Sequence, residues 1–494
     1  ILVTDKKISS VQDILPALEA TAKTGKKELI IKNTINASGF MADLTGKVRL
    51  AMKQDEQGGT QVLRVDGEAF KAVYSCNAQE SCGPLQFHKD GKRVYFETNK
   101  GDPDLTRLTL LDVDTMKEEF VEEDPDKQVD LSGVEFSEKT DELVATMYEG
   151  DRMRIYPRHP DFENDLKFVK KMLPQGDIRF ASSTADDQLH IVIVTSDVDP
   201  GAAYLYDRQS QKLDFLYRPR PRLPVQHLVE MKPVRIHARD GVVVPAYLSL
   251  PKGVDAKGLP AVLLVHGGPW ARDRWGYNSF AQFLANRGYV VLQPNFRGSE
   301  GFGKKFLNLG NGQWGTGTMQ HDLSDARNWL VKQGIADEKR IAIMGGSYGG
   351  YATLAGVAFT PDLYNAGVDI VGPSNIVTLL NTIPPYWAPI KKMFAVRVGD
   401  LDKPADVERL KMQSPLYSAK KIKAPLLVIQ GANDPRVKQA EADQIVMALR
   451  DAKLPVEYMV APDEGHGFRG RENRMAMMTA IESFLGKHLK GRVQ

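Results

Sequence analysis

A chain of 494 residues is too long for one ordinary hydrophobic core, so two or more domains are expected. Hydrophobic residues make up 42% of the chain and charged residues 26%, which is usual for soluble globular proteins. The net charge is only +2 with both signs interspersed, and no apolar run reaches the length of a transmembrane helix, so neither nucleic acid nor a membrane is expected as a partner.

Residues 1–222 contain a repeat of short strands. Strand-like runs that follow polar turns contain Val48, Val94, Leu143 and Leu189, which succeed one another at intervals of 46 to 49 residues. Such repeats are typical of β-propeller blades, and about four blades fit between residues 40 and 220. Larger rings are commoner, so the propeller is expected to be incomplete, with N-terminal blades missing from a mature or truncated chain. A β-sandwich is the alternative.

The chain has two cysteines, Cys76 and Cys82. They are either unrelated thiols or the ends of a small disulfide loop between strands, and the sequence leaves both interpretations open. A disulfide would indicate an oxidising compartment. Zinc is not expected, because no second pair of ligands stands nearby.

A stiff proline-rich linker, residues 218–224, separates this part from an α/β unit at residues 225–494. Strands and helices alternate there, which predicts a mostly parallel sheet covered on both faces. The expected strands are Val234–Ala238, Val244–Leu250, Ala261–Val265, Val290–Pro294, Ile341–Met344, Ala366–Ile370, Leu426–Gln430 and Val456–Val460. The expected helices include Ser279–Arg287, Asp322–Gln333, Ser347–Phe359, Lys438–Ala452 and Arg471–Leu489.

Residues 345–350 read GGSYGG, between the strand at 341–344 and the helix at 347–359. A strand, a tight glycine turn with one serine and a helix are the setting of a nucleophile elbow. Side chains at Gly345 or Gly349 would collide with the neighbouring strand or helix, so the glycines fit a turn that holds Ser347 in a strained backbone conformation. A plain strand-to-helix turn is the alternative for this motif alone.

A serine hydroxyl becomes a nucleophile only when a base takes its proton. Asp434 lies on the loop after the strand at 426–430, and His466 lies between two glycines on the loop after the last strand. The order Ser, Asp, His is that of an α/β-hydrolase triad, with Ser347 as nucleophile, Asp434 as acid and His466 as base. Asp463 and Asp402 are the alternatives for the acid.

Residues 266–270 read HGGPW and directly follow the strand at 261–265. A His-Gly-Gly turn at this place presents backbone N–H groups to a developing oxyanion, and the N–H after the nucleophile joins them. Gly268 and Tyr348 are therefore the expected donors of the oxyanion hole, and His266 is expected to be a structural part of the turn.

With these residues in view, the chain resembles the prolyl oligopeptidase family of serine peptidases (S9), and within it the acylaminoacyl-peptidase-like branch. The matching stretches are residues 266–269, 294–303 (PNFRGSEGFG), 313–315, 345–350, 433–437 and 465–467. The resemblance implies hydrolysis of short peptides through an acyl-enzyme on Ser347, and it places the family's triad and oxyanion donors on the residues named above. It also implies a propeller of seven or eight blades that limits entry to the site, whereas this sequence shows about four.

An apolar pocket for the side chain before the scissile bond is expected near Ile370, Tyr386 and Trp387, although packing in the core is an equal alternative for this loop. An esterase with the same triad and a shielding propeller is the alternative function, and a non-catalytic binding scaffold is disfavoured by the intact triad. No metal or organic cofactor is required.

The expected partners are short peptides, and a homo-oligomer is left open. Periplasmic or secreted localisation is expected, with the cytoplasm as alternative. The sequence leaves open the preferred residue before the cut, the need for a free or blocked substrate N-terminus, and endo- or exopeptidase action.

Overall fold

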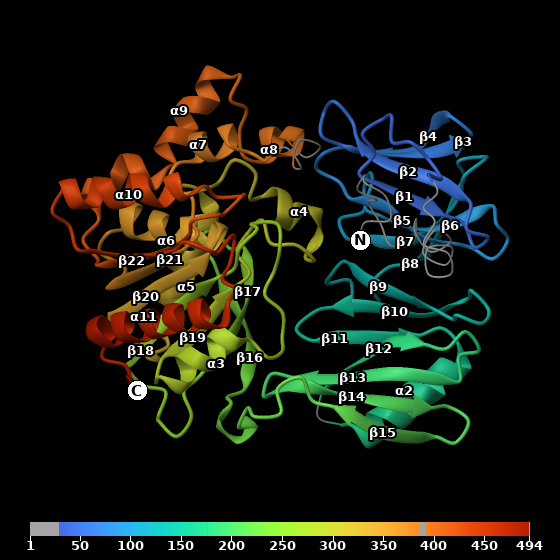
Figure 1. Ribbon diagram of the computed structural model, residues 1–494, viewed down its shortest axis with the longest axis horizontal. Helices are drawn as coiled ribbons and strands as arrows, with labels where there is room; N and C mark the ends of the chain where they lie inside the picture. The colour runs from blue at the N-terminus through green and yellow to red at the C-terminus, as the bar shows by residue number, and fades with distance from the viewer. Residues whose placement is uncertain (1–28, 175, 385–386, 388–390, 494) are drawn as a thin grey trace.

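The computed structural model describes residues 29–174, 176–384, 387 and 391–493. These residues form two parts that lie side by side (Figure 1). One part consists of small antiparallel sheets, and the other is an eight-stranded mixed sheet covered by helices. The predicted combination of a propeller domain and an α/β-hydrolase fold is confirmed.

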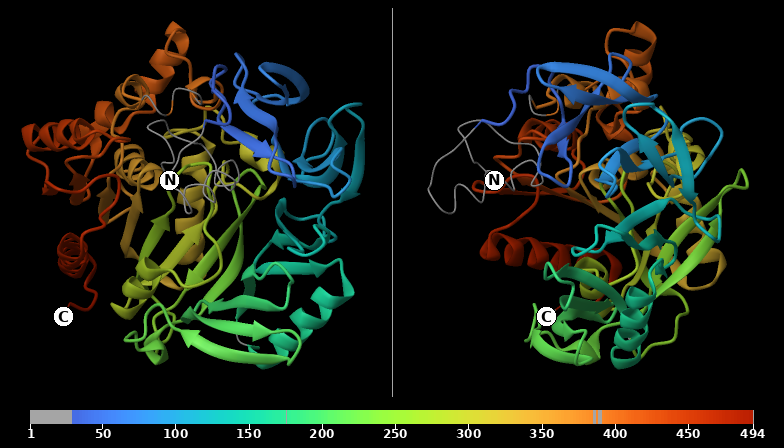
Figure 2. Two further views of the ribbon diagram at one scale, coloured as in Figure 1. Left: turned by 45° about the vertical axis from the view of Figure 1, so that its right-hand side comes forward. Right: turned by 90° about the vertical axis from the view of Figure 1, so that its right-hand side faces the viewer.

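The first part contains four small sheets, and each sheet holds one repeat of the sequence. Val48, Val94, Leu143 and Leu189 all lie in the second strand of their sheets, so the repeat marks equivalent positions. The strands are β1 Gly39–Ala42, β2 Val48–Gln54, β3 Thr60–Asp66 and β4 Ala69–Cys76; β5 Cys82–Phe87, β6 Arg93–Thr98, β7 Arg107–Asp112 and β8 Glu118–Glu122; β9 Leu131–Phe136, β10 Leu143–Glu149 and β11 Met153–Pro157; and β12 Asp177–Ser183, β13 Leu189–Ser196, β14 Asp199–Asp207 and β15 Lys212–Tyr217. A 90° turn of the molecule brings these sheets in front of the large sheet (Figure 2).

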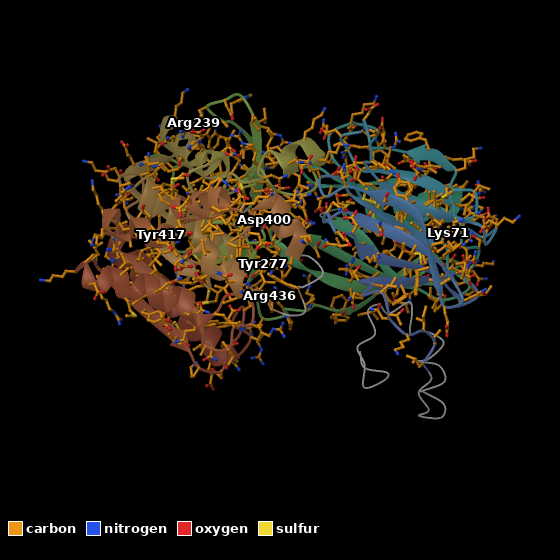
Figure 3. All side chains as sticks on the ribbon, turned by 90° about the horizontal axis from the view of Figure 1, so that it is seen from above. Lys71, Arg239, Tyr277, Asp400, Tyr417 and Arg436 are labelled. Atoms are coloured by element: carbon orange, nitrogen blue, oxygen red, sulfur yellow. A yellow bond between two sulfur atoms is a disulfide. The ribbon has the colours of Figure 1, made fainter. Side chains whose placement is uncertain are left out.

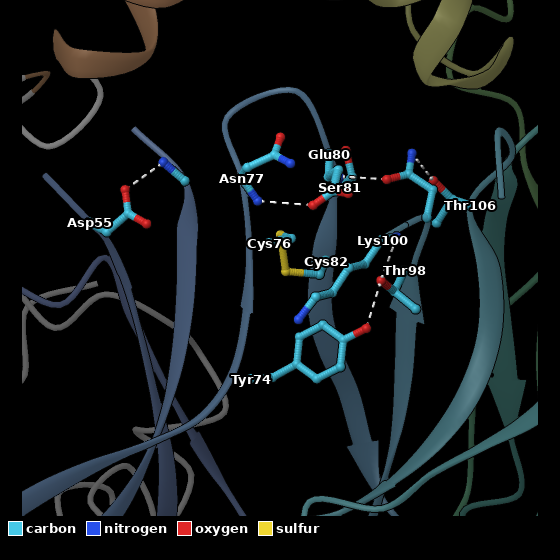
Figure 4. Close-up of a disulfide and its surroundings, with 12 residues drawn as sticks. Asp55, Tyr74, Cys76, Asn77, Glu80, Ser81, Cys82, Thr98, Lys100 and Thr106 are labelled. Carbon is cyan, nitrogen blue, oxygen red and sulfur yellow. Dashed lines mark hydrogen bonds between the residues drawn. A yellow bond between two sulfur atoms is a disulfide. The ribbon is translucent and has the colours of Figure 1, made fainter. Parts of the chain in front are cut away.

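A disulfide joins the first of these sheets to the second. Cys76 ends β4 and is bonded to Cys82, which begins β5 (Figure 4). Beside it, the hydroxyl of Tyr74 lies 3.1 Å from Oγ1 of Thr98, so polar contacts also link the two sheets. The sequence left open whether the two cysteines are separate thiols or a disulfide, and in the structure they form a disulfide.

A helix that the sequence analysis did not predict, α2 (Pro160–Met172), lies between β11 and β12. It buries Phe162, Leu166 and Val169, which recur at helical spacing and pack against the core of the third and fourth sheets. Among the described residues of this part, α2 is an insertion between β-strands.

The large sheet has the strand order β16-β17-β19-β18-β20-β21-β22-β23. β17 is antiparallel to both of its neighbours, β16 and β19, and the six strands from β19 to β23 in this order are parallel to one another. The loops at the carboxyl ends of the parallel strands therefore meet along one edge. The strands are β16 Met231–His237, β17 Val243–Ser249, β18 Leu259–Val265, β19 Val290–Pro294, β20 Ala336–Gly346, β21 Ala366–Ile370, β22 Leu426–Gly431 and β23 Val456–Ala461.

Helices cover both faces of this sheet. On one face α3 and α11 pack on apolar side chains of the strands, and on the other α5, α6 and α10 do so. The helices are α3 Ser279–Asn286, α4 Gly303–Asn308, α5 Thr318–Lys332, α6 Tyr348–Phe359, α7 Ile376–Asn381, α8 Lys391–Arg397, α9 Pro404–Met412, α10 Gln439–Asp451 and α11 Arg471–Leu489, with 3-10 turns η2 Val225–His227 and η4 Pro415–Lys421. None of the described helices is long and apolar enough to span a bilayer.

The two parts are joined by buried hydrogen bonds. Arg272, which is 7% exposed, donates to the carbonyl oxygens of Glu149 (2.7 Å) and Gly150 (3.0 Å) at the end of β10. The N–H of Met231 at the start of β16 donates to Asp197 in the fourth small sheet (2.7 Å). Seen from above, Lys71 lies on the outer side of the propeller and Arg239 lies on the hydrolase unit (Figure 3).

Candidate active site

Ser347 lies at the sharp turn between β20 and α6. Its backbone has φ 58° and ψ −119°, a region that residues with a side chain rarely occupy. Two backbone hydrogen bonds stabilise the turn. The N–H of Ser347 donates to the carbonyl oxygen of Ile370 (2.9 Å), and the N–H of Tyr351 donates to the carbonyl oxygen of Ser347 (3.0 Å). This is the strained geometry of a nucleophile elbow.

The glycines of the elbow permit close backbone packing. A Cβ at Gly349 would lie 2.1 Å from the carbonyl oxygen of Val265, and a Cβ at Gly345 would lie 2.5 Å from the same atom. Both distances are far below van der Waals contact, so the expected collisions are present. A Cβ at Gly346 would meet nothing nearer than 3.8 Å, so this glycine has room for a methyl group.

The structure brings the three sequence-predicted triad residues together. Nε2 of His466 lies 3.0 Å from Oγ of Ser347, and Nδ1 of His466 lies 2.7 Å from Oδ2 of Asp434. Asp434 is 2% exposed, and its other carboxylate oxygen accepts the N–H groups of Arg436 (2.8 Å) and Val437 (3.0 Å). The carboxylate is therefore fixed by its own loop, and the imidazole bridges it to the serine.

The alternatives for the acid lie elsewhere. Asp463 is exposed and accepts a hydrogen bond from Asn473 (2.9 Å), and Asp402 is exposed after α8. Of these carboxylates, only that of Asp434 contacts the imidazole of His466.

The turn after β18 lies against the nucleophile. A Cβ at Gly267 would lie 3.0 Å from the carbonyl oxygen of Gly346 and 3.3 Å from Cβ of Ser347. In the described part of the chain the N–H of Gly268 makes no hydrogen bond, and Tyr348, the first residue of α6, has no acceptor for its N–H within the helix. The N–H groups of both expected oxyanion donors are therefore uncommitted among the described residues: Tyr348 directly follows Ser347, and Gly268 follows Gly267, which lies against Ser347.

His266 is a structural member of this turn. Its Nδ1 lies 2.8 Å from the carbonyl oxygen of Gly267, and its Nε2 lies 2.9 Å from Oγ of Ser299. The ring stacks on Phe296 with centroids 4.5 Å apart, and burial lowers the pKa of the imidazole. A neutral ring with both nitrogens occupied fits the structural role that the sequence predicted for it.

A buried carboxyl lies directly beneath the elbow. Oδ1 of Asp369 accepts the N–H of Gly372 (2.9 Å) and would lie 2.3 Å from a Cβ at Gly350, while Oδ2 is buried and has no hydrogen-bond partner among the described residues. Burial raises the pKa of Asp369 to about 8, although the N–H of Gly372 opposes this shift. Val371 in the same turn has φ 49°, which is unusual for a β-branched residue.

The expected pocket residues are placed only in part. Ile370 lies beside the elbow, because its carbonyl oxygen accepts the N–H of Ser347. Tyr386 lies outside the described residues. Trp387 stacks on Phe394 of α8 (centroids 5.8 Å apart), and Phe394 meets Trp270 of the oxyanion turn edge-on (5.2 Å). The sequence analysis did not identify Trp270 and Phe394 as site residues, although Trp270 follows the recognised His-Gly-Gly turn directly.

A cavity of about 470 Å³ lies between the propeller and the hydrolase unit. Its basic side chains are already engaged, because Arg274 pairs with Glu149 (2.5 Å) and Lys304 donates to the carbonyl oxygen of Asn99 (2.7 Å). The carboxylates of Glu97 and Glu300 also line it, and within the described part of the chain neither forms a hydrogen bond or ion pair. Burial, and then the charge of Asp130, raise the pKa of Glu97 to about 7.

Among the described residues, no group of three or more His, Cys, Asp or Glu side chains is placed to hold a metal ion.

The chain is similar in sequence to a family of peptidases and to individual peptidases. Residues 275–492 match the sequence profile described as the prolyl oligopeptidase family. Dipeptidyl aminopeptidase BIII of Pseudoxanthomonas mexicana is 42% identical over 489 residues, covering 95% of this chain and 69% of that protein. Dipeptidyl peptidase family member 6 of Caenorhabditis elegans is 38% identical over 531 residues, covering all of this chain and 71% of that protein.

Among solved structures, a puromycin-hydrolysing peptidase of Mycobacterium tuberculosis matches with a TM-score of 0.78. The sequence identity is 22%, and the match covers 95% of this chain and 72% of that one. At this identity the likeness shows the fold.

Proposed function

Because the chain belongs to the prolyl oligopeptidase family and is a serine peptidase, we propose that Ser347, His466 and Asp434 form its catalytic triad. The observation that carries this proposal is the hydrogen-bonded chain from Oγ of Ser347 through the imidazole to Asp434. No other residue set is needed to activate the serine.

In the first half-reaction, Oγ of Ser347 attacks the scissile carbonyl carbon while Nε2 of His466 takes the hydroxyl proton. Asp434 stays ionised and accepts a hydrogen bond from the Nδ1–H of His466 throughout, which keeps the correct tautomer and stabilises the imidazolium. The imidazolium then gives its proton to the leaving amine. In the second half-reaction, a water molecule deprotonated by His466 attacks the acyl-enzyme and releases Ser347.

We assign the backbone N–H groups of Gly268 and Tyr348 to the oxyanion that forms on the carbonyl oxygen. Tyr348 directly follows Ser347, Gly268 follows the glycine that lies against it, and fixed donors in a site poor in water stabilise developing charge without reorganising. Removing one such donor typically costs a factor of about 10² to 10³ in kcat.

We further propose that the substrate is a short peptide with a free amino terminus, from which the enzyme releases a dipeptide. The names of the two relatives quoted above support this class of substrate. The cavity beside Arg272 supports it as well, since the unpaired carboxylates of Glu97 and Glu300 would find a counter-charge in a substrate ammonium group. Ile370 and Trp387 are proposed to line the apolar pocket for the residue before the cut.

The test compares three amides that release 4-nitroaniline, namely an aminoacyl-4-nitroanilide, a dipeptidyl-4-nitroanilide and its N-acetylated form, with the 4-nitrophenyl ester of the same dipeptide. We expect the free dipeptidyl amide to be cleaved at least about 100-fold faster than the acetylated one, and Ser347→Ala to abolish cleavage of both amide and ester. Faster cleavage of the acetylated amide would instead indicate an enzyme that accepts a blocked N-terminus, and cleavage of the ester alone would indicate an esterase.

Glu97→Gln and Glu300→Gln should raise KM for the free dipeptidyl amide about tenfold and leave KM for the ester of an N-blocked substrate unchanged. Glu408→Gln, at a side chain 69% exposed on α9, is the matched control. Equal effects on free and blocked substrates would contradict the assignment of the ammonium site.

We also propose an oxidising compartment, periplasmic or extracellular, for this protein. The disulfide between Cys76 and Cys82 supports it, because such bonds persist outside the reducing cytosol. Titration of free thiols in protein isolated from its native compartment tests it: two free thiols would contradict the proposal.

A further inference from the structure

The loop that carries His466 is rich in glycine and would be mobile without a brace. It joins β23 to α11 and contains Gly465, Gly467 with φ 110°, and Gly470. Glycine lowers the cost of moving the backbone, yet the imidazole has to stay within hydrogen-bonding distance of both Ser347 and Asp434. Something other than the local backbone preference must therefore hold the loop.

The carboxylate of Glu464 connects the two ends of this loop. Its Oε2 accepts the N–H of Arg469 (2.9 Å), and its Oε1 accepts the N–H of Gly470 (2.7 Å) and an amide N–H of Asn473 (2.9 Å). All three donors lie after His466 in the chain, whereas Glu464 lies before it. A Cβ at Gly470 would lie only 2.8 Å from Oε1, so the glycine makes this closure possible.

The main chain of Glu464 is tied to the loop of the catalytic acid. Its carbonyl oxygen accepts the N–H of Asn433, the residue before Asp434 (2.9 Å), and a Cβ at Gly431 would lie 2.7 Å from the same oxygen. The side-chain amide of Asn433 donates in turn to the carbonyl oxygen of Pro462 (2.8 Å). One residue therefore joins the acid loop, the base loop and the start of α11.

The surroundings distinguish Glu464 from its neighbour Asp463. Glu464 is 5% exposed and is satisfied by neutral amide donors, of which the N–H of Arg469 contributes most to lowering the pKa of its carboxyl. Asp463 is exposed and shares only the contact to Asn473. The two adjacent carboxylates thus differ in whether they contact the backbone of the loop.

We propose that Glu464 is the positioning residue that fixes His466 between Ser347 and Asp434. It contacts neither the substrate nor the reacting atoms, and it acts by closing the loop that carries the base. This inference rests on the proposed triad. Ser347→Ala separates the two ideas, because an active Ser347→Ala variant would refute the triad, whereas an inactive one leaves Glu464 to be tested alone.

The test is Glu464→Gln, which keeps the size of the side chain but offers one oxygen and a donor group to three N–H donors. We expect kcat to fall about 10- to 100-fold with KM within twofold of the wild type, because the base is misplaced while the binding groups are intact. The downfield proton resonance of Nδ1 of His466, which reports its bond to Asp434, should broaden or vanish. Asp463→Asn is the matched control and should change neither quantity.

If Glu464 only caps α11, Glu464→Gln will lower the melting temperature while kcat per folded molecule and the downfield resonance stay as in the wild type, and the proposal is then wrong. Should Glu464→Gln fail to fold, Asn473→Ala takes its place, because it removes one of the three donors without touching the backbone of the loop. It should lower kcat about three- to tenfold, and an unchanged kcat would overturn the proposal.

Discussion

The carboxyl beneath the nucleophile elbow gives a sharp prediction about stability. In Asp369→Asn, Oδ1 would still accept the N–H of Gly372, and the amide nitrogen would replace the oxygen that is buried without a partner. Asparagine is thus close in shape and charge to the protonated carboxyl, which a pKa of about 8 makes the main form at neutral pH. We expect activity within a few-fold of the wild type.

The magnitude follows from proton linkage. The folded state keeps a proton that the unfolded state releases near pH 4, so between pH 4 and pH 8 the unfolded chain binds fewer protons and the free energy of unfolding falls as pH rises. The slope is about 1.4 kcal/mol per pH unit, which amounts to about 4 kcal/mol between pH 4 and pH 7. Asparagine does not titrate, so Asp369→Asn should be the more stable protein at pH 7 by up to about this amount.

The assay is urea unfolding of the wild type and Asp369→Asn at pH 5, 6 and 7. The advantage of the variant should grow by about 1.4 kcal/mol for each pH unit. Asp362→Asn, at a side chain 77% exposed, is the control and should show no such growth. A difference that stays constant with pH would refute the reasoning, since it would mean that the buried carboxyl does not hold its proton.

Three further predictions concern the elbow, the disulfide and the pocket. Gly349→Ala should destabilise the fold by about 3 kcal/mol or more, because its Cβ would lie 2.1 Å from a carbonyl oxygen of β18. Gly346→Ala should fold, and equal melting temperatures of the two variants would contradict this prediction. Replacing Cys76 and Cys82 by serine should cost about 2 kcal/mol, and a reductant should lower the melting temperature of the wild type but not of the double variant. Trp387→Ala should reduce kcat/KM about tenfold for peptides with a large apolar residue before the cut relative to alanine, and an unchanged preference would remove Trp387 from the pocket.

The residues of the elbow could be predicted because their constraints are local. The spacing of Gly345, Ser347 and Gly349 follows from the backbone approach of neighbouring strands, and each glycine is visible in the sequence. The loops of Asp434 and His466 could be found for a similar reason, since each directly follows a short apolar strand. Parallel strands bring such loops to one edge, so chain order was enough to place them together.

Other features depend on contacts that no local pattern specifies. The packing of Trp270 on Phe394 joins segments far apart in the chain, so neither residue could be assigned to the pocket. The strand β20 begins at Ala336 rather than near Ile341, because Ala336 pairs with Leu259 of β18, and a shift of register before Ala261 takes up the polar residues 337–340. Helix α2 was missed although Phe162 and Leu166 have helical spacing, because the surrounding strand repeat favoured β structure.

The guanidinium group of Arg272 couples two parts of the molecule that could otherwise be regarded as separable modules. It lies two residues after Trp270, stacks over the ring of Phe302 at 4.1 Å, and takes its acceptors from the backbone of Glu149 and Gly150. Cutting the chain at the proline-rich linker would leave this cation with neither acceptor, next to the turn that faces the nucleophile. Residues 225–494 therefore do not form an independent unit. A different N-terminal domain fused to them would have to provide two carbonyl acceptors for Arg272 at the same positions.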